Sequence, residues 1–174
     1  MYYFASDIHL GAGDAATARA VERRFVAWLD DAARDAEAIF LVGDIFDFWF
    51  EYRRVVPKGF VRTLGRLAEL TDRGVRVVFF TGNHDMWVGD YLARECGLEI
   101  HTSPEVMTLS FATQIHALCF LGKNYRYIKV LCSNTGDTDT GCFNCKDFSD
   151  WTVGEAAFEF FADFIDEGNI HLMI

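Results

Sequence analysis

Three short polar segments carry the residue types that bind divalent metal ions. Asp7 and His9 lie in the first segment, Asp44 in the second, and Asn83 with His84 in the third. Carboxylate oxygens, imidazole nitrogens and amide oxygens are ligands that suit Mn²⁺, Fe²⁺, Zn²⁺ and Mg²⁺. Asp7 and His9 are two residues apart, so on an extended segment they can point to the same side. Because one carboxylate such as Asp44 can bridge two ions, we predict a shared two-metal site.

Each segment alone has an ordinary structural explanation. Asp7-Ile8-His9 is typical of a polar loop, Gly43-Asp44 of a turn or helix cap, and Gly82-Asn83-His84-Asp85 of a turn. Their conjunction favours the metal site, because all three segments follow apolar runs that are separated by stretches long enough for a helix.

These apolar runs are the elements that must position the ligands. Tyr2–Ser6, Ile39–Val42 and Val75–Phe80 are short and apolar, as expected for strands of a parallel sheet that is buried on both faces. The carboxyl ends of such strands meet at one edge, where open α/β sheets hold their ligands. Right-handed βαβ crossovers would bring the three polar segments together at that edge.

Two helices are expected to connect the strands. Asp14 is the predicted N-cap of the first helix. Its apolar face repeats at helical spacing and comprises Val21, Phe25, Trp28, Leu29 and Ala32. The second helix is predicted to begin at Pro57 and to end at Gly74. Its expected apolar face comprises Phe60, Val61, Leu64, Leu67, Ala68 and Leu70.

Composition indicates one globular domain, 1–174, of which 51% of the residues are hydrophobic. The net charge of −10 argues against nucleic acid as a partner. The N-terminal segment has no basic stretch before its short apolar run, and no run is long enough to span a membrane. We therefore expect a cytoplasmic protein, whose odd number of cysteines, five, is more typical of reduced thiols than of disulfides.

The motifs SDIHLG at 6–11, GDIFDFW at 43–49 and GNHD at 82–85 resemble the calcineurin-like metallophosphoesterase superfamily. More narrowly, residues 1–105 resemble the UDP-2,3-diacylglucosamine pyrophosphohydrolases of lipid A biosynthesis. The resemblance implies an α/β fold, a four-layer α/β/β/α sandwich, around two divalent metal ions, with Mn²⁺ favoured. It also implies hydrolysis of UDP-2,3-diacylglucosamine to 2,3-diacylglucosamine 1-phosphate (lipid X) and UMP.

The same resemblance implies a role for each motif residue. Asp7 and His9 would bind the first metal ion, Asp44 would bridge the two ions, and Asn83 would bind the second. His84 would act near the scissile phosphate, where it would stabilise charge or protonate the leaving oxygen.

Asp85 would orient His84 in this scheme. Close to Asp44, an aromatic cluster could line an acyl-chain groove at the inner membrane, with core packing as the alternative. The cluster comprises Phe46, Phe48, Trp49, Phe50 and Tyr52.

The C-terminal third departs from the family pattern. It lacks the Gly-His-Gly-Asp and Gly-His-x-His motifs that complete both metal shells in the family, and His116 is the remaining candidate ligand. His101 and His171 are expected to be exposed strand residues. We hypothesise that residues 106–150 come from a frameshifted, rearranged or strongly diverged segment, and the C-terminal sheet is then incomplete. Resequencing the source gene tests this hypothesis.

Residues 151–174 are expected to close the domain with a hairpin of Phe161–Ile165 and Ile170–Ile174, although a helix is the alternative for the first arm. Two classes of function follow from these patterns. One is an active hydrolase of a nucleotide-linked lipid, or of another nucleotide or phosphodiester. The other is a catalytically crippled member of the fold that serves as a binding module.

Overall fold

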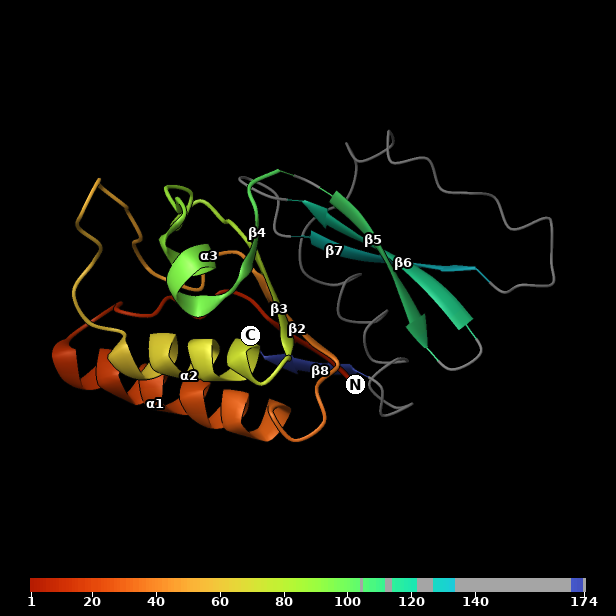
Figure 1. Ribbon diagram of the computed structural model, residues 1–174, viewed down its shortest axis with the longest axis horizontal. Coiled ribbons are helices and arrows are strands. Elements are labelled where there is room, and N and C mark those ends of the chain that lie inside the picture. Colours follow the sequence, from red (N-terminus) through yellow and green to blue (C-terminus); the bar gives the residue numbers. More distant parts are fainter. Residues whose placement is uncertain (104, 112–113, 122–126, 134–169, 174) are drawn as a thin grey trace.

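A five-stranded parallel sheet forms the centre of the computed structural model, which describes residues 1–103, 105–111, 114–121, 127–133 and 170–173 (Figure 1). The strand order is β4-β3-β2-β1-β8, and every neighbouring pair is parallel. The strands are β1 (Tyr2–Ala5), β2 (Ala38–Val42), β3 (Arg76–Phe80), β4 (Glu99–His101) and β8 (Ile170–Met173). The three apolar runs of the sequence are thus strands, as predicted.

Both faces of this sheet are buried. Ile39 and Leu41 point into the core beneath the helices, whereas Phe4 and Phe40 on the opposite face are equally inaccessible and stack with ring centroids 4.9 Å apart. Continuous apolar strands are expected in a parallel sheet that is covered on both sides. This burial explains why the strands carry no alternating polar pattern.

Helix α1 (Ala15–Ala32) covers one face of the sheet beside α2 (Figure 1). Its N-cap is Asp14, as predicted, and the Asp14 carboxylate accepts hydrogen bonds from the backbone N–H groups of Ala16 and Thr17. Side-chain capping of this kind satisfies N–H groups that have no partner inside the helix. The buried residues Phe25, Leu29 and Ala32 confirm the core of the predicted face.

Helix α2 (Val61–Asp72) begins four residues later than predicted. Phe60 is its N-cap with a left-handed backbone (φ 58°), and its ring contacts those of Phe46 and Trp49 at centroid distances of 5.1 and 6.2 Å. This tertiary packing accompanies the turn that delays the helix. Val61 was expected on the apolar face but is 76% exposed, and the helix buries Thr63, Leu67 and Leu70.

Two corrections concern the segment after β3. Helix α3 (Tyr91–Cys96) was not predicted, because six residues show too little periodicity. His101 lies on strand β4, as expected, but it is not exposed. Its ring stacks on Phe80 with centroids 4.8 Å apart, and its Nε2 lies 3.0 Å from a Glu99 carboxylate oxygen.

A second, antiparallel sheet has the order β5-β6-β7 and lies on the side of the first sheet away from α1 and α2 (Figure 1). Its strands are β5 (Glu105–Phe111), β6 (Gln114–Leu121) and β7 (Tyr127–Ser133). The described residues thus form an α/β fold with one helical layer and two sheets. The second helical layer of the expected sandwich is not among the described residues and stays a prediction.

The C-terminal arm of the predicted hairpin is strand β8, which pairs in parallel with β1. Its expected partner, Phe161–Ile165, lies outside the described residues, so the hairpin itself stays a prediction.

Candidate metal centre

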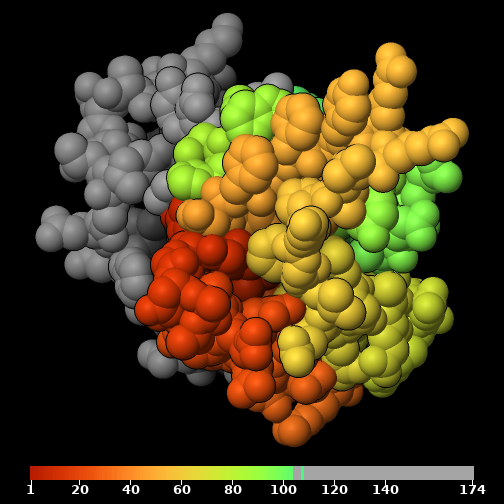
Figure 2. All heavy atoms as spheres, turned by 90° about the vertical axis from the view of Figure 1, so that its left-hand side faces the viewer, coloured from red at the N-terminus to blue at the C-terminus, as the bar shows by residue number. Residues whose placement is uncertain are grey.

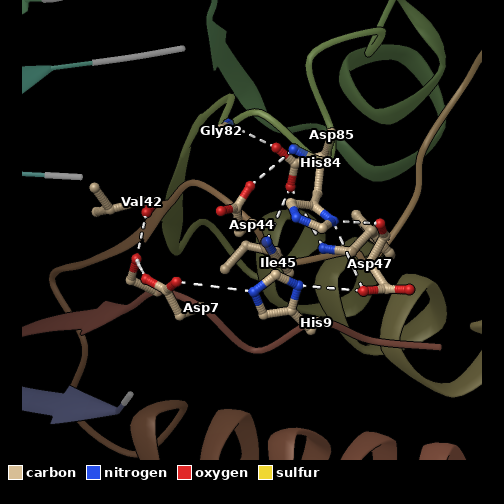
Figure 3. Close-up of polar contacts among 11 residues, drawn as sticks. Asp7, His9, Val42, Asp44, Ile45, Asp47, Gly82, His84 and Asp85 are labelled. Atoms are coloured by element: carbon tan, nitrogen blue, oxygen red, sulfur yellow. Dashed lines mark hydrogen bonds and ion pairs between the residues drawn. The ribbon is translucent and has the colours of Figure 1, made fainter. Parts of the chain in front are cut away.

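Three loops meet at the carboxyl ends of β1, β2 and β3 (Figure 3). Backbone hydrogen bonds join them: Asp7 N–H donates to Gly43 O at 3.3 Å, His9 N–H to Asp44 O at 3.0 Å, and Gly43 N–H to Phe80 O at 2.9 Å. The loops are therefore held in register with the strands that precede them. The shared edge predicted from the sequence is present.

Side chains from these loops converge on one point. Ligand atoms of His9, Asp44 and His84 all lie within 4.8 Å of one another, and Asp7 Oδ1 lies 3.8 Å from His9 Nε2 (Figure 3). Asp7 is also positioned by Ser6, whose Oγ lies 2.9 Å from Asp7 Oδ2 and 2.6 Å from Val42 O. Carboxylates and imidazoles at such spacing fit a divalent transition-metal ion.

The backbone at this point is strained. Asp7, His9 and Asp44 have φ values of 55°, 48° and 52°, in the left-handed region that non-glycine residues seldom adopt. Each such residue costs about 1 kcal/mol or more, and it persists only where the surrounding structure holds it. Strain that gathers on three convergent polar residues indicates a functional site.

Gly82 allows the second and third loops to approach closely. A Cβ atom at this position would lie 2.3 Å from Asp44 Oδ1 and 2.5 Å from Asp44 N. Asp44 itself is 1% exposed, and its Oδ1 accepts a hydrogen bond from His84 N–H at 2.9 Å. The glycine therefore lets a buried carboxylate sit directly against the backbone of the third loop.

Asp85 also joins the same two loops. Its Oδ1 accepts from Gly82 N–H at 2.6 Å, and its Oδ2 accepts from the N–H groups of Ile45 and Phe46 at 2.9 and 3.4 Å. Burial raises the pKa of this carboxyl to about 6, although the three N–H groups act in the opposite direction. Asp85 was expected to orient His84; its carboxylate accepts hydrogen bonds from the backbone of the two loops that carry Asp44 and His84.

Asp47 holds the two histidines, a role that sequence reasoning missed. Its Oδ1 lies 3.3 Å from His9 Nδ1 and 3.7 Å from His84 Nδ1, and its backbone O lies 2.8 Å from His84 Nδ1. The two rings meet edge to face with centroids 4.6 Å apart. Since a carbonyl oxygen only accepts, Nδ1 of His84 carries a proton. The available signal was the second aspartate of GDIFD, three residues after Asp44.

Two further ligands, Asn83 and His116, were predicted from the sequence. Asn83 is exposed and lies between Gly82 and His84 in the third loop. His116 lies on β6, where its backbone is paired with Leu109 and Cys132, and its side chain is outside the part of the structure that is described. Its role as a ligand stays a prediction.

The aromatic cluster after Asp44 divides into two groups. Phe46 and Trp49 are fully buried, as the core-packing alternative predicts. Phe48, Phe50 and Tyr52 are 57%, 43% and 61% exposed.

No helix among the described residues has the length and apolar character needed to cross a membrane.

Comparison with known proteins agrees with this geometry. The family model for calcineurin-like phosphoesterases matches residues 2–171. A UDP-2,3-diacylglucosamine hydrolase from Porphyromonas gingivalis is 46% identical over 127 residues, which are 73% of this chain and 48% of the relative.

Further relatives carry the same name at lower identity. The protein from Nitrosococcus oceani is 30% identical over 62% of this chain and 41% of the relative, and that from Pseudomonas aeruginosa PAO1 is 34% identical over 61% and 42%. The matched part of this chain spans just under half the length of these relatives. With the family model matching nearly all of its length, the chain belongs to the calcineurin-like phosphoesterase family.

Proposed function

We propose that the chain is a metal-dependent hydrolase acting on the pyrophosphate bond of UDP-2,3-diacylglucosamine. The products are 2,3-diacylglucosamine 1-phosphate and UMP, in lipid A biosynthesis. The observation that carries this proposal is the convergence of Asp7, His9, Asp44 and His84 at the carboxyl edge of the sheet. The name of the similar proteins supports the choice of substrate.

The proposed cofactor is a pair of divalent ions, with Mn²⁺ preferred to Fe²⁺, Zn²⁺ or Mg²⁺. Asp7 and His9 would hold the first ion, Asp44 would be shared, and Asn83 would hold the second, with His116 as a further candidate. When bound, such ions supply Lewis acidity toward the phosphate oxygens. The strained backbone at three of these residues supports the assignment.

His84 is the proposed general acid. Its Nδ1 is occupied by the Asp47 carbonyl, so a proton for the leaving oxygen must come from Nε2 of the imidazolium form. The Asp47 carboxylate oxygen Oδ1 lies 3.7 Å from the same Nδ1. Asp85 is a positioning residue, because its carboxylate connects the backbones of the two loops that carry Asp44 and His84.

The proposed partner is a small nucleotide-lipid, and the net charge of −10 disfavours nucleic acid. We propose a cytoplasmic location with peripheral contact to the inner membrane, where an acylated substrate resides. Hydrolysis of another nucleotide or phosphodiester is the second candidate, since the metal motifs specify a phosphoester and not a lipid. A crippled binding module is the third, favoured by the missing distal histidine motifs.

Elemental analysis after loading with Mn²⁺ and dialysis tests the metal centre. Wild type and Asp72→Ala, an exposed aspartate at the end of α2, should each retain about two ions per chain. Asp44→Ala should lose them. One ion or fewer in the wild type would overturn the two-metal proposal and favour the binding module. If two ions are present, turnover of UDP-2,3-diacylglucosamine against an aryl phosphodiester distinguishes the first two candidates.

A further inference from the structure

An exposed aromatic surface lies beside the metal centre. This surface, called the aromatic face below, comprises Phe48, Phe50, Tyr52, Val55 and Trp87, which are 43% to 64% exposed. The Trp87 ring joins the two phenylalanines, with centroids 6.0 Å from Phe48 and 6.2 Å from Phe50. Several large apolar side chains that remain exposed together mark an interaction surface.

The backbone beneath the aromatic face is firmly held. The Glu51 carboxylate accepts hydrogen bonds from Trp49 Nε1–H and Tyr91 N–H, both at 3.0 Å, while Glu51 N–H donates to Trp87 O at 3.3 Å. Trp49 N–H also donates to His84 O at 3.2 Å. These bonds bind the segment after β2 to the segment after β3, so the rings are presented outward from a braced support.

Segment 48–60, which carries four of the five residues of the aromatic face, has a net positive charge, opposite in sign to that of the whole chain. Arg53, Arg54 and Lys58 are all exposed, and Glu51 is the only acidic residue from 48 to 60. The Glu51 carboxylate is engaged by the two N–H groups, whereas the chain as a whole carries a net charge of −10. Figure 2 shows this orange-to-yellow segment standing out at the upper edge of the molecule.

Aromatic rings interleaved with basic side chains suit the surface of a lipid bilayer. At a bilayer, rings settle at the level of the headgroups, and arginine and lysine reach the lipid phosphates while their stems contact apolar surface. Anionic lipid adds electrostatic attraction to the burial of apolar area. A soluble acidic protein could form ion pairs with the cations. It would offer no apolar layer to the three exposed phenyl and indole rings.

We propose that the aromatic face, together with Arg53, Arg54 and Lys58, docks the protein on an anionic phospholipid bilayer. Phe48 directly follows Asp47, and Trp87 lies three residues after His84, so docking brings the metal centre close to the lipid surface. This inference deepens the peripheral-membrane part of the proposed function. It does not depend on catalysis.

Sedimentation with vesicles tests the docking surface without any substrate. The probes are vesicles of phosphatidylcholine, alone or with about one third phosphatidylglycerol. The first variant is Arg53→Glu/Arg54→Glu. Its matched control is Arg23→Glu/Arg24→Glu, an adjacent exposed pair on α1 that changes the net charge by the same amount. The second variant, Phe48→Ser/Phe50→Ser, removes apolar contacts and leaves the charge unchanged.

Wild type and the α1 control should bind anionic vesicles about tenfold or more tightly than neutral ones. The Arg53/Arg54 variant should lose roughly twentyfold in affinity, and the phenylalanine variant at least about tenfold. The proposal would be overturned if the two double arginine variants lost the same affinity for anionic vesicles, or if wild type showed no preference for anionic over neutral vesicles. A wild-type dimer that the phenylalanine variant converts to a monomer would also overturn it, because a second copy would then cover the face. Vesicle binding by a chain without hydrolase activity supports the docking surface and counts only against the proposed activity.

Discussion

Asp47 shows how one side chain can set the chemistry of two others. A carboxylate near Nδ1 of His9 favours the tautomer that carries its proton there, which leaves Nε2 as the ligand atom facing Asp7. The same residue holds Nδ1 of His84 through its carbonyl oxygen. Asp47 thus links the first metal-binding loop to the proposed general acid, although it is not itself a proposed ligand.

Asp47→Ala should weaken Mn²⁺ binding by about 10- to 100-fold, because His9 loses the partner that orients its ring. The carbonyl contact to His84 is a backbone interaction and should survive. Titration of Mn²⁺ against a competing chelator measures the change. Asp72→Ala is the control, and an affinity equal to wild type in Asp47→Ala would refute the positioning role.

The loops after β2 and β3 act as one unit at the scale of the elements. Asp85 connects their backbones from a buried position, and Gly82 leaves room for the Asp44 carboxylate at their contact. Three left-handed residues nearby are held in place by this unit and by its hydrogen bonds to the loop after β1. The precision of the site therefore depends on how closely two loop backbones approach.

Gly82→Ala should displace Asp44, since the new Cβ would otherwise lie 2.3 Å from its Oδ1. We expect a loss of about 2 kcal/mol in the free energy of unfolding, together with loss of Mn²⁺ binding. Gly65→Ala is the matched control on α2. It has nothing within 4 Å of the added atom, and alanine there should stabilise the helix by about 0.5–1 kcal/mol. Urea unfolding measures both variants, and equal effects would contradict the close-approach argument.

Two tyrosines of β1 tie the sheet to the connection between α1 and β2 at the scale of the whole molecule. Tyr2 Oη donates to Glu37 at 2.5 Å, and Tyr3 Oη donates to Asp35 at 2.6 Å. Burial, followed by the hydrogen bond to the carboxylate, raises the pKa of each phenol to about 12. Since β1 lies between β2 and β8, these bonds anchor an interior strand of the sheet.

The pKa shifts predict how stability changes at high pH. The folded protein keeps both phenols protonated above the ordinary pKa of 10, so their stabilisation is complete below pH 10 and is lost as pH rises toward 12. Tyr2→Phe/Tyr3→Phe should be less stable than wild type by about 2 kcal/mol at pH 9. This difference should shrink toward pH 12. Urea unfolding at several pH values measures it, with the exposed Tyr52→Phe as control, and a difference that does not vary with pH would refute the argument.

Local patterns were enough to predict the parallel strands β1, β2 and β3 and the Asp14 cap. A strand buried on both faces must be apolar along its whole length, and a cap bonds to residues two and three positions away. The same reasoning predicted that the polar residues after these strands meet at one edge of the sheet, because parallel strands end together. These residues are Asp7, His9, Asp44 and His84. The family was also evident from these motifs, and the match over residues 2–171 confirms it.

Only the tertiary structure decided the contacts that join distant segments. It placed the Asp85 carboxylate against backbone N–H groups 40 and 39 positions away, and it placed the Asp47 carboxylate near both histidines. It also set the start of α2 at Val61, directly after Phe60, whose ring packs against Phe46. The tertiary structure likewise determined which aromatic residues after Asp44 are buried in the core and which are exposed. Such outcomes depend on which loops approach each other in space, and spacing along the chain does not contain that information.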